Sequence, residues 1–379
     1  MTTVGVGMVG HAFMGRAHSQ AWRNVGPFFG PPLSPVMAVL AGRSAERAGA
    51  AARALGWAAV ETDWKELLRR DDVDLVDICT PGDSHAEIAV AALDAGKHVL
   101  CEKPLANTVA EAAAMADAAE RARARGVRAM VGFNYRRVPA IALARRLVAD
   151  GRLGAVRQVR AQYLQDWLAD ADAPYTWRMD RDRAGSGALG DIGAHIIDTV
   201  QHVTGQRITG VSSLLGTFVP ERPRPGGGTG RVTVDDAALF IGRTDGGALA
   251  SFEATRVAAG RKNALRVEVN GSDGSLAFDL ESLNELWFHD RAEDAETAGF
   301  RRILVTEPVH PYAGKWWPPG HLLGYEHTFT HQAADLLTAI AEGGDPSPSF
   351  ADGLQVQRVL AAVQAGAESG AWTDVEGSA

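Results

Sequence analysis

Two acid–base side chains lie four residues apart in a glycine-rich part of this 379-residue chain. Asp191 and His195 follow the glycine loop at 185–187, and the intervening residues suit a helix. Residues i and i+4 share one helix face, so both side chains can reach a single substrate hydroxyl. Imidazole titrates near neutral pH and can take a hydroxyl proton while a hydride leaves the carbon. A helix-terminal acid beside a structural histidine is the alternative if these residues stand alone.

A lysine supplies a third polar group. Residues 97–101 predict a short strand, and the turn Cys101-Glu102-Lys103-Pro104 places Lys103 at its carboxyl end. Ligands of open parallel α/β sheets bind at that end of the strands. Lys103 can there polarise a substrate oxygen or share the role of base with His195, while Asp191 orients the imidazole or holds a hydroxyl.

A nucleotide-binding turn opens the chain. Residues 4–9 predict a strand, and Gly10-His11-Ala12-Phe13-Met14-Gly15 leads from it into a helical segment. Strand, glycine turn and helix are the context that a dinucleotide fingerprint requires. Ala12 replaces the usual second glycine, which shifts the site slightly because one methyl group intrudes. The expected cofactor contacts of this turn are Gly10, Ala12, Phe13, Met14 and Gly15.

The next strand, at 36–41, bears on the choice of cofactor. An acid at its end usually binds the ribose hydroxyls of NAD, but this chain has Gly42-Arg43-Ser44. Arg43 and Ser44 can bind a 2′-phosphate, so NADP stays open beside NAD. Further expected cofactor contacts follow the later strands of the same sheet: Thr80, Pro81, His85, Glu102 and Lys103.

The order of elements predicts two domains. Strands alternate with helices up to residue 133, which indicates a doubly wound parallel sheet of the Rossmann type in an α/β protein. From 134 to 379, long strands separated by glycine turns predict an α+β domain with a large, mostly antiparallel open sheet, whose last helix can pack back on the first domain. Such a sheet offers one face to another subunit, so we expect a homodimer or homotetramer.

Composition narrows the function further. A net charge of -8 and a pI near 5.8 argue against nucleic acid or an anionic membrane as partner. Cys79 and Cys101 are too few for a disulfide framework and predict buried thiols in a reducing compartment. No stretch approaches the ~20 apolar residues of a membrane span, so we expect a cytoplasmic protein. His327 and His331 lack a carboxylate motif, and we predict no metal.

Taken in order, these motifs resemble the glucose–fructose oxidoreductase / inositol dehydrogenase / rhizopine-catabolism (Gfo/Idh/MocA) family over most of the chain. The carrying segments are residues 10–15, Thr80-Pro81 with His85, residues 102–104, and Gly190-Asp191 with His195. The resemblance implies that Lys103, Asp191 and His195 form the catalytic set and that NAD is the cofactor. Shorter matches at 163–167, 185–187 and 349–353 are similar to the levoglucosan- and inositol-type branch. Departures from the family pattern are Ala12, Gly42 and Gly82.

The family implies a small sugar or polyol substrate bound between the two domains. Aromatic planes pack on sugar rings, and Asp and Arg bind hydroxyls. The candidate substrate contacts are Tyr135, Arg136, Asp166, Trp167 and Tyr325.

Three functional hypotheses follow. The first is an NAD(P)-dependent dehydrogenase that reversibly oxidises a secondary hydroxyl of a sugar, glycoside or cyclic polyol, of inositol, anhydrosugar or aminoglycoside type, to a ketone. The second uses tightly held NAD on the same site for redox-neutral glycoside cleavage or epimerisation. The third is a nucleotide-binding sensor without catalysis.

Overall fold

The computed structural model describes residues 2–377, which form two compact units. The first unit contains the chain up to Asn134 together with Gly324–Gln355, and the second contains Tyr135–Leu323 and the chain from Val356 onwards. The sequence placed everything after residue 133 in the second domain. Residues 324–355 correct that expectation, because they return to the first unit. The outermost ends of the expected domains, residue 1 and residues 378–379, lie outside the described residues.

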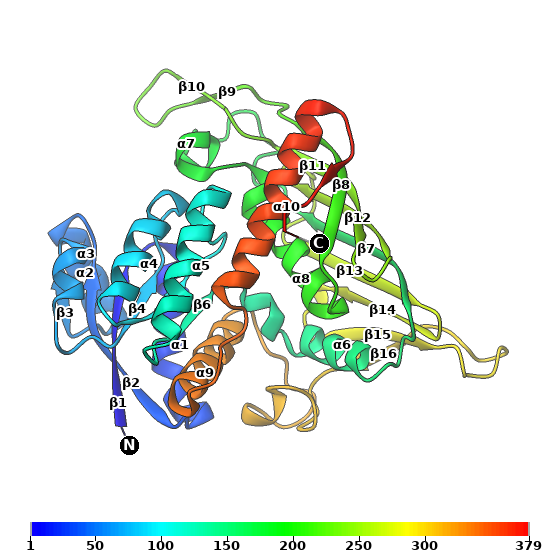
Figure 1. Ribbon diagram of the computed structural model, residues 1–379, viewed down its shortest axis with the longest axis horizontal. Coiled ribbons are helices and arrows are strands. Elements are labelled where there is room, and N and C mark those ends of the chain that lie inside the picture. The colour runs from blue at the N-terminus through cyan, green and yellow to red at the C-terminus, as the bar shows by residue number, and fades with distance from the viewer. Residues whose placement is uncertain (1, 378–379) are drawn as a thin grey trace. The chain divides into compact units, whose positions relative to one another are not determined.

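The first unit is built on a six-stranded parallel sheet of order β3-β2-β1-β4-β5-β6 (Figure 1). The strands read as apolar runs because both faces of such a sheet are covered. The strand order reverses between β1 and β4, and ligands bind at the carboxyl ends of the strands at such a point. The bounds are β1 Thr2–Val9, β2 Leu33–Ala41, β3 Ala59–Glu61, β4 Leu75–Ile78, β5 His98–Cys101 and β6 Ala129–Val131.

Helices cover this sheet, and one of them explains the division of the chain. Phe329, Leu336 and Leu337 of α9 are buried in the same apolar core as Trp22 and Val25 of α1. This packing makes residues 324–355 part of the first unit. The helices are α1 Phe13–Phe29, α2 Ala45–Leu55, α3 Trp64–Leu68, α4 His85–Asp94, α5 Val109–Arg123 and α9 His327–Glu342.

The second unit contains a nine-stranded sheet of order β16-β15-β14-β13-β7-β12-β11-β8-β17. Only β7 and β12 pair in parallel, so the sheet is mostly antiparallel, as predicted. The bounds are β7 Val156–Leu164, β8 Ile208–Gly216, β11 Ala237–Thr244, β12 Leu249–Thr255, β13 Ala264–Gly271, β14 Gly274–Asp279, β15 Glu285–Asp290, β16 Arg301–Leu304 and β17 Thr373–Asp374. A separate ribbon consists of β9 Glu221–Pro223 and β10 Thr229–Arg231.

Helices lie against this sheet, yet one of its faces stays open. Buried and exposed residues alternate along β11, where Phe240 is buried and Leu239 and Ile241 are exposed. On the open face the side chains border a hollow of about 890 Å³. The helices are α6 Pro139–Ala149, α7 Arg181–Ala184, α8 Ala194–Thr204 and α10 Phe350–Ser369, and α10 begins among residues of the first unit.

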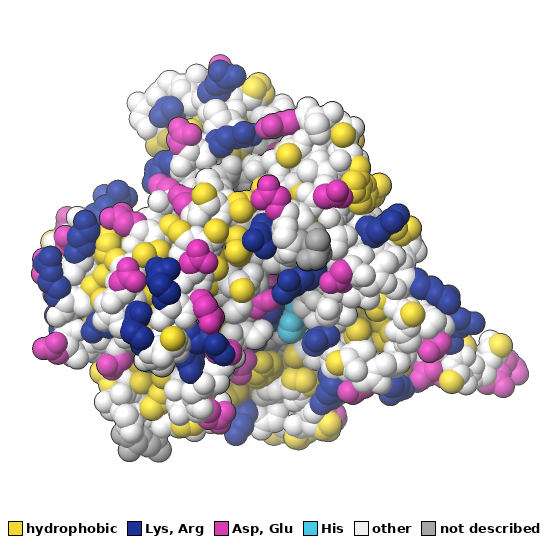
Figure 2. Space-filling model, viewed as in Figure 1, with side chains coloured by type: hydrophobic (Ala, Val, Ile, Leu, Met, Phe, Trp, Pro, Cys, Tyr) yellow, Lys and Arg dark blue, Asp and Glu magenta, His cyan; other side chains and the backbone are white. Residues whose placement is uncertain are grey.

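The surface carries mixed charge. On the face drawn in Figure 2, basic and acidic side chains are interspersed. Among residues 2–377, no helix is both long and apolar enough to span a membrane.

Candidate active site

The turn between β1 and α1 is shaped by two glycines. Gly10 has φ +101°, and a Cβ there would lie 2.8 Å from the carbonyl oxygen of Cys79. A Cβ on Gly15 would lie 2.4 Å from the carbonyl oxygen of Gly10. Ala12 precedes α1, whose first amides donate no hydrogen bond to an N-cap side chain. Exposed amides at a helix N-terminus bind phosphate, so the backbone of Phe13 and Met14 fits a dinucleotide pyrophosphate.

The segment after β2 shows why the usual acid is missing. A Cβ on Gly42 would lie 2.7 Å from the His11 ring, so the histidine fills the space of a larger side chain. Ser44 caps α2, because its Oγ accepts a hydrogen bond of 3.4 Å from the Arg47 amide. This role differs from the phosphate contact that the sequence suggested for Ser44. Arg43 lies between these two positions.

His85 ties two cofactor-side turns together. Its Nδ1 lies 3.0 Å from the carbonyl oxygen of Pro104, and its Nε2 lies 2.9 Å from that of Thr80. The Thr80 hydroxyl also accepts a hydrogen bond of 2.7 Å from Ser84. The side chain of His85 is buried, so its contacts position the turn at Pro81 rather than present a ring at the surface.

The buried carboxylate of Glu102 anchors the turn that carries Lys103. Glu102 is buried, and its Oε2 accepts a hydrogen bond of 3.3 Å from the Lys103 amide. The carboxylate therefore faces the core, and the Lys103 side chain is only partly buried. Tyr325, expected as a substrate contact, belongs to the first unit, where its ring stacks on Phe13 with the ring centres 6.1 Å apart.

In the second unit, Asp191 and His195 lie where a π-helical turn, Leu189–Gly193, runs into α8. The sequence predicted a regular helix here, and the π turn is the correction. Such turns are frequent at functional sites. Asp235 holds the turn, because its carboxylate accepts hydrogen bonds of 2.7 and 2.8 Å from the amides of Gly187 and Leu189. Burial raises the pKa of Asp235 in spite of these two bonds.

Two tyrosine rings pack against His195. The ring centre of His195 lies 4.6 Å from that of Tyr135 and 5.8 Å from that of Tyr163. The two tyrosine hydroxyls are 2.8 Å apart, and Tyr163 donates a hydrogen bond of 2.7 Å to Asn263. The imidazole thus packs against two aromatic rings whose hydroxyl groups are hydrogen-bonded to each other. Tyr135 was predicted here, and Tyr163 and Asn263 were not predicted as site residues.

A buried arginine faces Asp191. Arg256 is fully buried, and its Nη1 lies 3.9 Å from Asp191 Oδ2. Its guanidinium also lies 5.4 Å from the ring centre of Trp167, which is 41% exposed. Burial lowers the pKa of Arg256, and the nearby Asp191 and Asp235 oppose that shift. Sequence reasoning missed Arg256 because a single arginine at a strand end gives no signal.

Two predicted substrate contacts have partners in the second unit. Arg136 is buried, and its Nε lies 2.9 Å from Asp198 Oδ2. This ion pair holds the Arg136 side chain in place, and its expected contact with a sugar stays a prediction. Asp166 lies 2.7 Å from Lys262 Nζ, and this hydrogen bond, with further help from the Gly260 amide, lowers the pKa of the Asp166 carboxyl.

The predicted catalytic residues are divided between the units. Asp191 and His195 lie together in the second unit, whereas Lys103 belongs to the first. Their joint action therefore stays a prediction.

Known proteins match the whole chain. Residues 4–133 match the model of the oxidoreductase family with an NAD-binding Rossmann fold, and residues 141–277 match the GFO/IDH/MocA C-terminal domain. The chain belongs to this family of oxidoreductases, and the expected family and fold class are confirmed. The first domain is the NAD-binding domain of the family.

Particular relatives share the full length. Levoglucosan dehydrogenase of Pseudarthrobacter phenanthrenivorans is 42% identical over 99% of each chain. A crystal structure of an oxidoreductase domain protein from Kribbella flavida superposes with a TM-score of 0.97 at 69% identity, covering 99% of this chain and 100% of that one. A levoglucosan dehydrogenase in complex with NADH and levoglucosan gives a TM-score of 0.95 at 42% identity, with 99% of each chain covered.

Proposed function

We propose that this protein oxidises a secondary hydroxyl of an anhydrosugar or a related cyclic sugar to a ketone. The observation that carries the proposal is the pair of Asp191 on the π turn and His195 in the first turn of α8, with Tyr135 against His195 and the buried Arg256 facing Asp191. The broader class, a sugar or polyol dehydrogenase that uses NAD, is confirmed by the family match and the full-length relatives.

In the proposed reaction, His195 removes the hydroxyl proton while the carbon–hydrogen bond breaks. Bound NAD supplies the acceptor of the hydride. Asp191 binds the neighbouring hydroxyl or orients the imidazole, and the Arg256 guanidinium lies 3.9 Å from its carboxylate. Lys103 polarises the reacting oxygen. The proton passes from His195 to solvent, so the products are a ketone, reduced cofactor and one proton.

Levoglucosan is the first candidate substrate. A full-length relative is named for it, and solved structures of a levoglucosan dehydrogenase hold NADH with levoglucosan or with L-sorbose. In this chain, the exposed ring of Trp167 offers an apolar plane for a sugar ring, with Asp166 beside it in the sequence. NAD is the expected cofactor, since the family's Rossmann domain is described as NAD-binding.

The test is a substrate panel with purified protein. Levoglucosan, L-sorbose, inositols and aminoglycosides are each incubated with NAD and with NADP, and reduced nicotinamide is followed by its absorbance. We expect the largest kcat/KM with an anhydrosugar and NAD. Cofactor binding without turnover on any sugar would contradict the proposal and favour a sensor. Product formation without net cofactor reduction would favour redox-neutral chemistry.

We also infer that the protein is a homo-oligomer in which a second copy covers the open face of the nine-stranded sheet. Large apolar side chains are exposed on this sheet, with exposed fractions of 74% for Leu214, 49% for Leu239 and 58% for Ile241. Exposed apolar patches of this kind commonly mark interfaces. Leu239→Glu should lower the molar mass in light scattering, whereas a monomeric wild type would contradict the inference.

The cytoplasm is the proposed location. Cys79 and Cys101 are both free and buried, as suits a compartment that keeps thiols reduced. Fractionation of cells that express the chain tests this assignment.

A further inference from the structure

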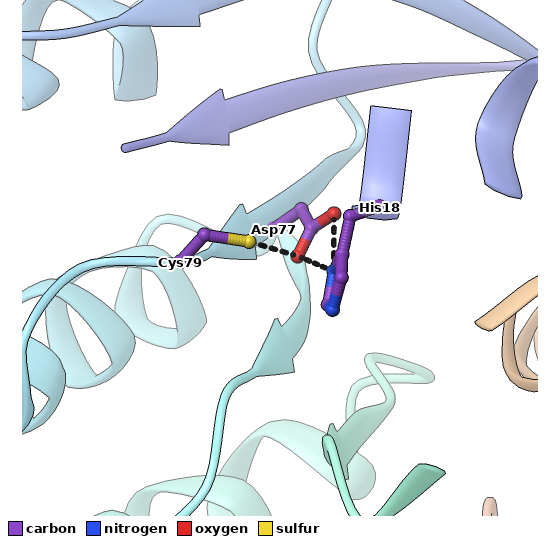
Figure 3. Close-up of side chains that lie close together, drawn as sticks. All are labelled: His18, Asp77 and Cys79. Carbon is purple, nitrogen blue, oxygen red and sulfur yellow. Dashed lines mark hydrogen bonds and ion pairs between the residues drawn. The ribbon is translucent and has the colours of Figure 1, made fainter. Parts of the chain in front are cut away.

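A histidine in the first unit is buried between two carboxylates. His18 of α1 has Nδ1 2.9 and 3.0 Å from the two carboxylate oxygens of Asp77 on β4 (Figure 3). Its Nε2 lies 3.0 Å from Oε1 of Glu102, which follows β5. At most 3% of each of the three residues is exposed. The three groups therefore form one continuous hydrogen-bonded chain, closed off from solvent.

The contacts define the protonation state of this chain. Carboxylates accept hydrogen bonds, and only an imidazolium donates from both ring nitrogens. Burial acts to lower the pKa of His18, but the charge and hydrogen bond of Asp77 outweigh it and hold that pKa well above its ordinary value. Trp22 donates a further hydrogen bond of 2.7 Å to Asp77. His18 is thus a buried imidazolium that lies between two carboxyl groups.

Cys79 joins His18 and Asp77 in a group that could hold a metal ion, because each residue offers one ligand atom and these atoms lie close together. A thiol must lose its proton to bind a metal well. Burial raises the pKa of Cys79 far above the usual range, and its Sγ lies 3.5 Å from Asp77 as a donor. The spacing between His18 and Asp77 is that of a hydrogen bond. The chemistry therefore favours a proton bridge over a metal ion.

The bridge reaches the turn that carries Lys103. Oε1 of Glu102 accepts a hydrogen bond from His18, and Oε2 accepts one from the Lys103 amide. Gly132 directly follows β6, and a Cβ there would lie 2.6 Å from Glu102 Oε1, so the absence of a side chain at Gly132 leaves room for this carboxylate. Movement of Glu102 would displace the backbone at Lys103.

We propose that His18 and Asp77 are positioning residues, which hold Glu102 through the buried proton bridge and thereby fix Lys103 relative to the start of α1. This inference rests on the proposed function, since it gives Lys103 a role in the reaction. His18 and Asp77 touch neither substrate nor cofactor in this account, and they act through Glu102 alone.

The experiment compares His18→Gln, Asp77→Asn and the double variant with wild type. Small displacements of a reacting group cost about 10- to 100-fold in rate, and we expect a fall of that order in kcat for each single variant, with the affinity for NAD changed less than about threefold. The double variant should fall no further than the worse single variant, because both break the same bridge. His98→Gln is the matched control: this histidine begins β5 and accepts the Arg128 amide at 3.0 Å, and its replacement should leave kcat within about twofold.

A pH series separates this role from simple packing. The titratable groups that face His18 are Asp77, Cys79 and Glu102, while α9 presents the ring of Phe329 at 5.2 Å. The pKa of His18 is raised in the folded state, so its stabilising contribution is complete below the unfolded value of about 6.5 and is lost as pH rises through the folded value. From about pH 7 to about pH 10, the Tm of wild type should fall more steeply than that of His18→Gln.

Three results would overturn the inference. The first is turnover within about twofold of wild type in folded His18→Gln and Asp77→Asn while Lys103→Ala is inactive. The second is an equal pH slope of Tm in wild type and His18→Gln. The third is stoichiometric zinc bound by wild type but not by His18→Gln. Wild-type inactivity on every sugar would instead contradict the proposed function, and the pH slopes would still test the bridge.

Discussion

The polar groups of the first unit and those of the second are held in different ways. Around His18, charge is fully buried, and both ring nitrogens have carboxylate partners at about 3 Å. Around His195, the ring is packed between two tyrosines, and Asp191 keeps 28% of its side chain exposed. A buried and fully bonded group suits a fixed support, whereas a partly exposed carboxylate beside an imidazole suits contact with a substrate. From this difference we infer that the first cluster positions other groups and that the second carries the chemistry.

Replacing His195 should give the largest effect. His195→Asn removes the proposed base, and a general base contributes about 10²- to 10⁴-fold to rate, so kcat should fall by that amount while NAD binds as before. Steady-state kinetics and a fluorescence titration with NAD measure the two quantities. His202→Gln on the same helix is the control, because burial holds the pKa of His202 at about 3 and keeps that ring neutral. Equal losses in both variants would mean that α8 as a whole, rather than His195, supports turnover.

Loosening the π turn should have the second largest effect. Asp235→Asn replaces a carboxylate that accepts two buried amide hydrogen bonds with a weaker acceptor. The expected cost is about 1–3 kcal/mol in the free energy of unfolding, together with a fall of about tenfold in kcat because Asp191 lies on that turn. Urea unfolding and kinetics check both. Asp245→Asn, at an exposed acid that accepts the Arg207 amide, should lose less than about 0.5 kcal/mol. Unchanged kcat in a destabilised Asp235→Asn would separate the turn from the chemistry.

A change at His85 tests the cofactor side of the comparison. His85→Leu removes both contacts to the carbonyl oxygens of Thr80 and Pro104. We expect a roughly tenfold weaker Kd for NAD, equivalent to about 1.4 kcal/mol, with a smaller change in kcat at saturating cofactor. Titration with NAD measures the first and kinetics the second. A loss confined to kcat would place His85 with the catalytic groups instead.

The tyrosine layer should show the smallest effect. Tyr163→Phe removes the hydroxyl that links Tyr135 to Asn263 and keeps the ring against His195. Because the ring that packs against His195 is kept, kcat should fall less than about fivefold. Tyr163→Ala removes the ring as well and should cost far more. Similar kinetics in the two variants would show that the hydroxyl, and not the ring, supports His195.

Much of the architecture could be predicted from the sequence. The parallel sheet follows from short apolar runs that alternate with helices, and the glycine turn at 10–15 lies where the fingerprint required it. The second sheet was recognisable from alternating strands, whereas a short strand such as β16, Arg301–Leu304, gives little signal because it starts with two arginines. The return of 324–355 to the first unit could not be foreseen, since it depends on α9 meeting α1 in a shared core.

The site was only partly predictable for the same reason. Asp191 and His195 can be recognised from their spacing in the sequence. His18, in contrast, is hydrogen-bonded to Asp77 and Glu102, which are 59 and 84 residues away. The buried partner of Arg136, Asp198, is 62 residues away and could not be recognised from the local sequence. Local pattern reveals a residue's chemistry, and long-range packing decides whether that chemistry supports the fold or faces a ligand.

Transfer of an isotopic label distinguishes hydride transfer to NAD from redox-neutral chemistry. Levoglucosan carrying deuterium on its ring carbons is incubated with NAD and wild-type protein, and the recovered cofactor and sugar are analysed by mass spectrometry. For a dehydrogenase we expect a ketone product and reduced cofactor that carries the deuterium. His195→Asn should form neither. Sugar products that form while the cofactor stays oxidised and unlabelled would contradict the assignment as a dehydrogenase.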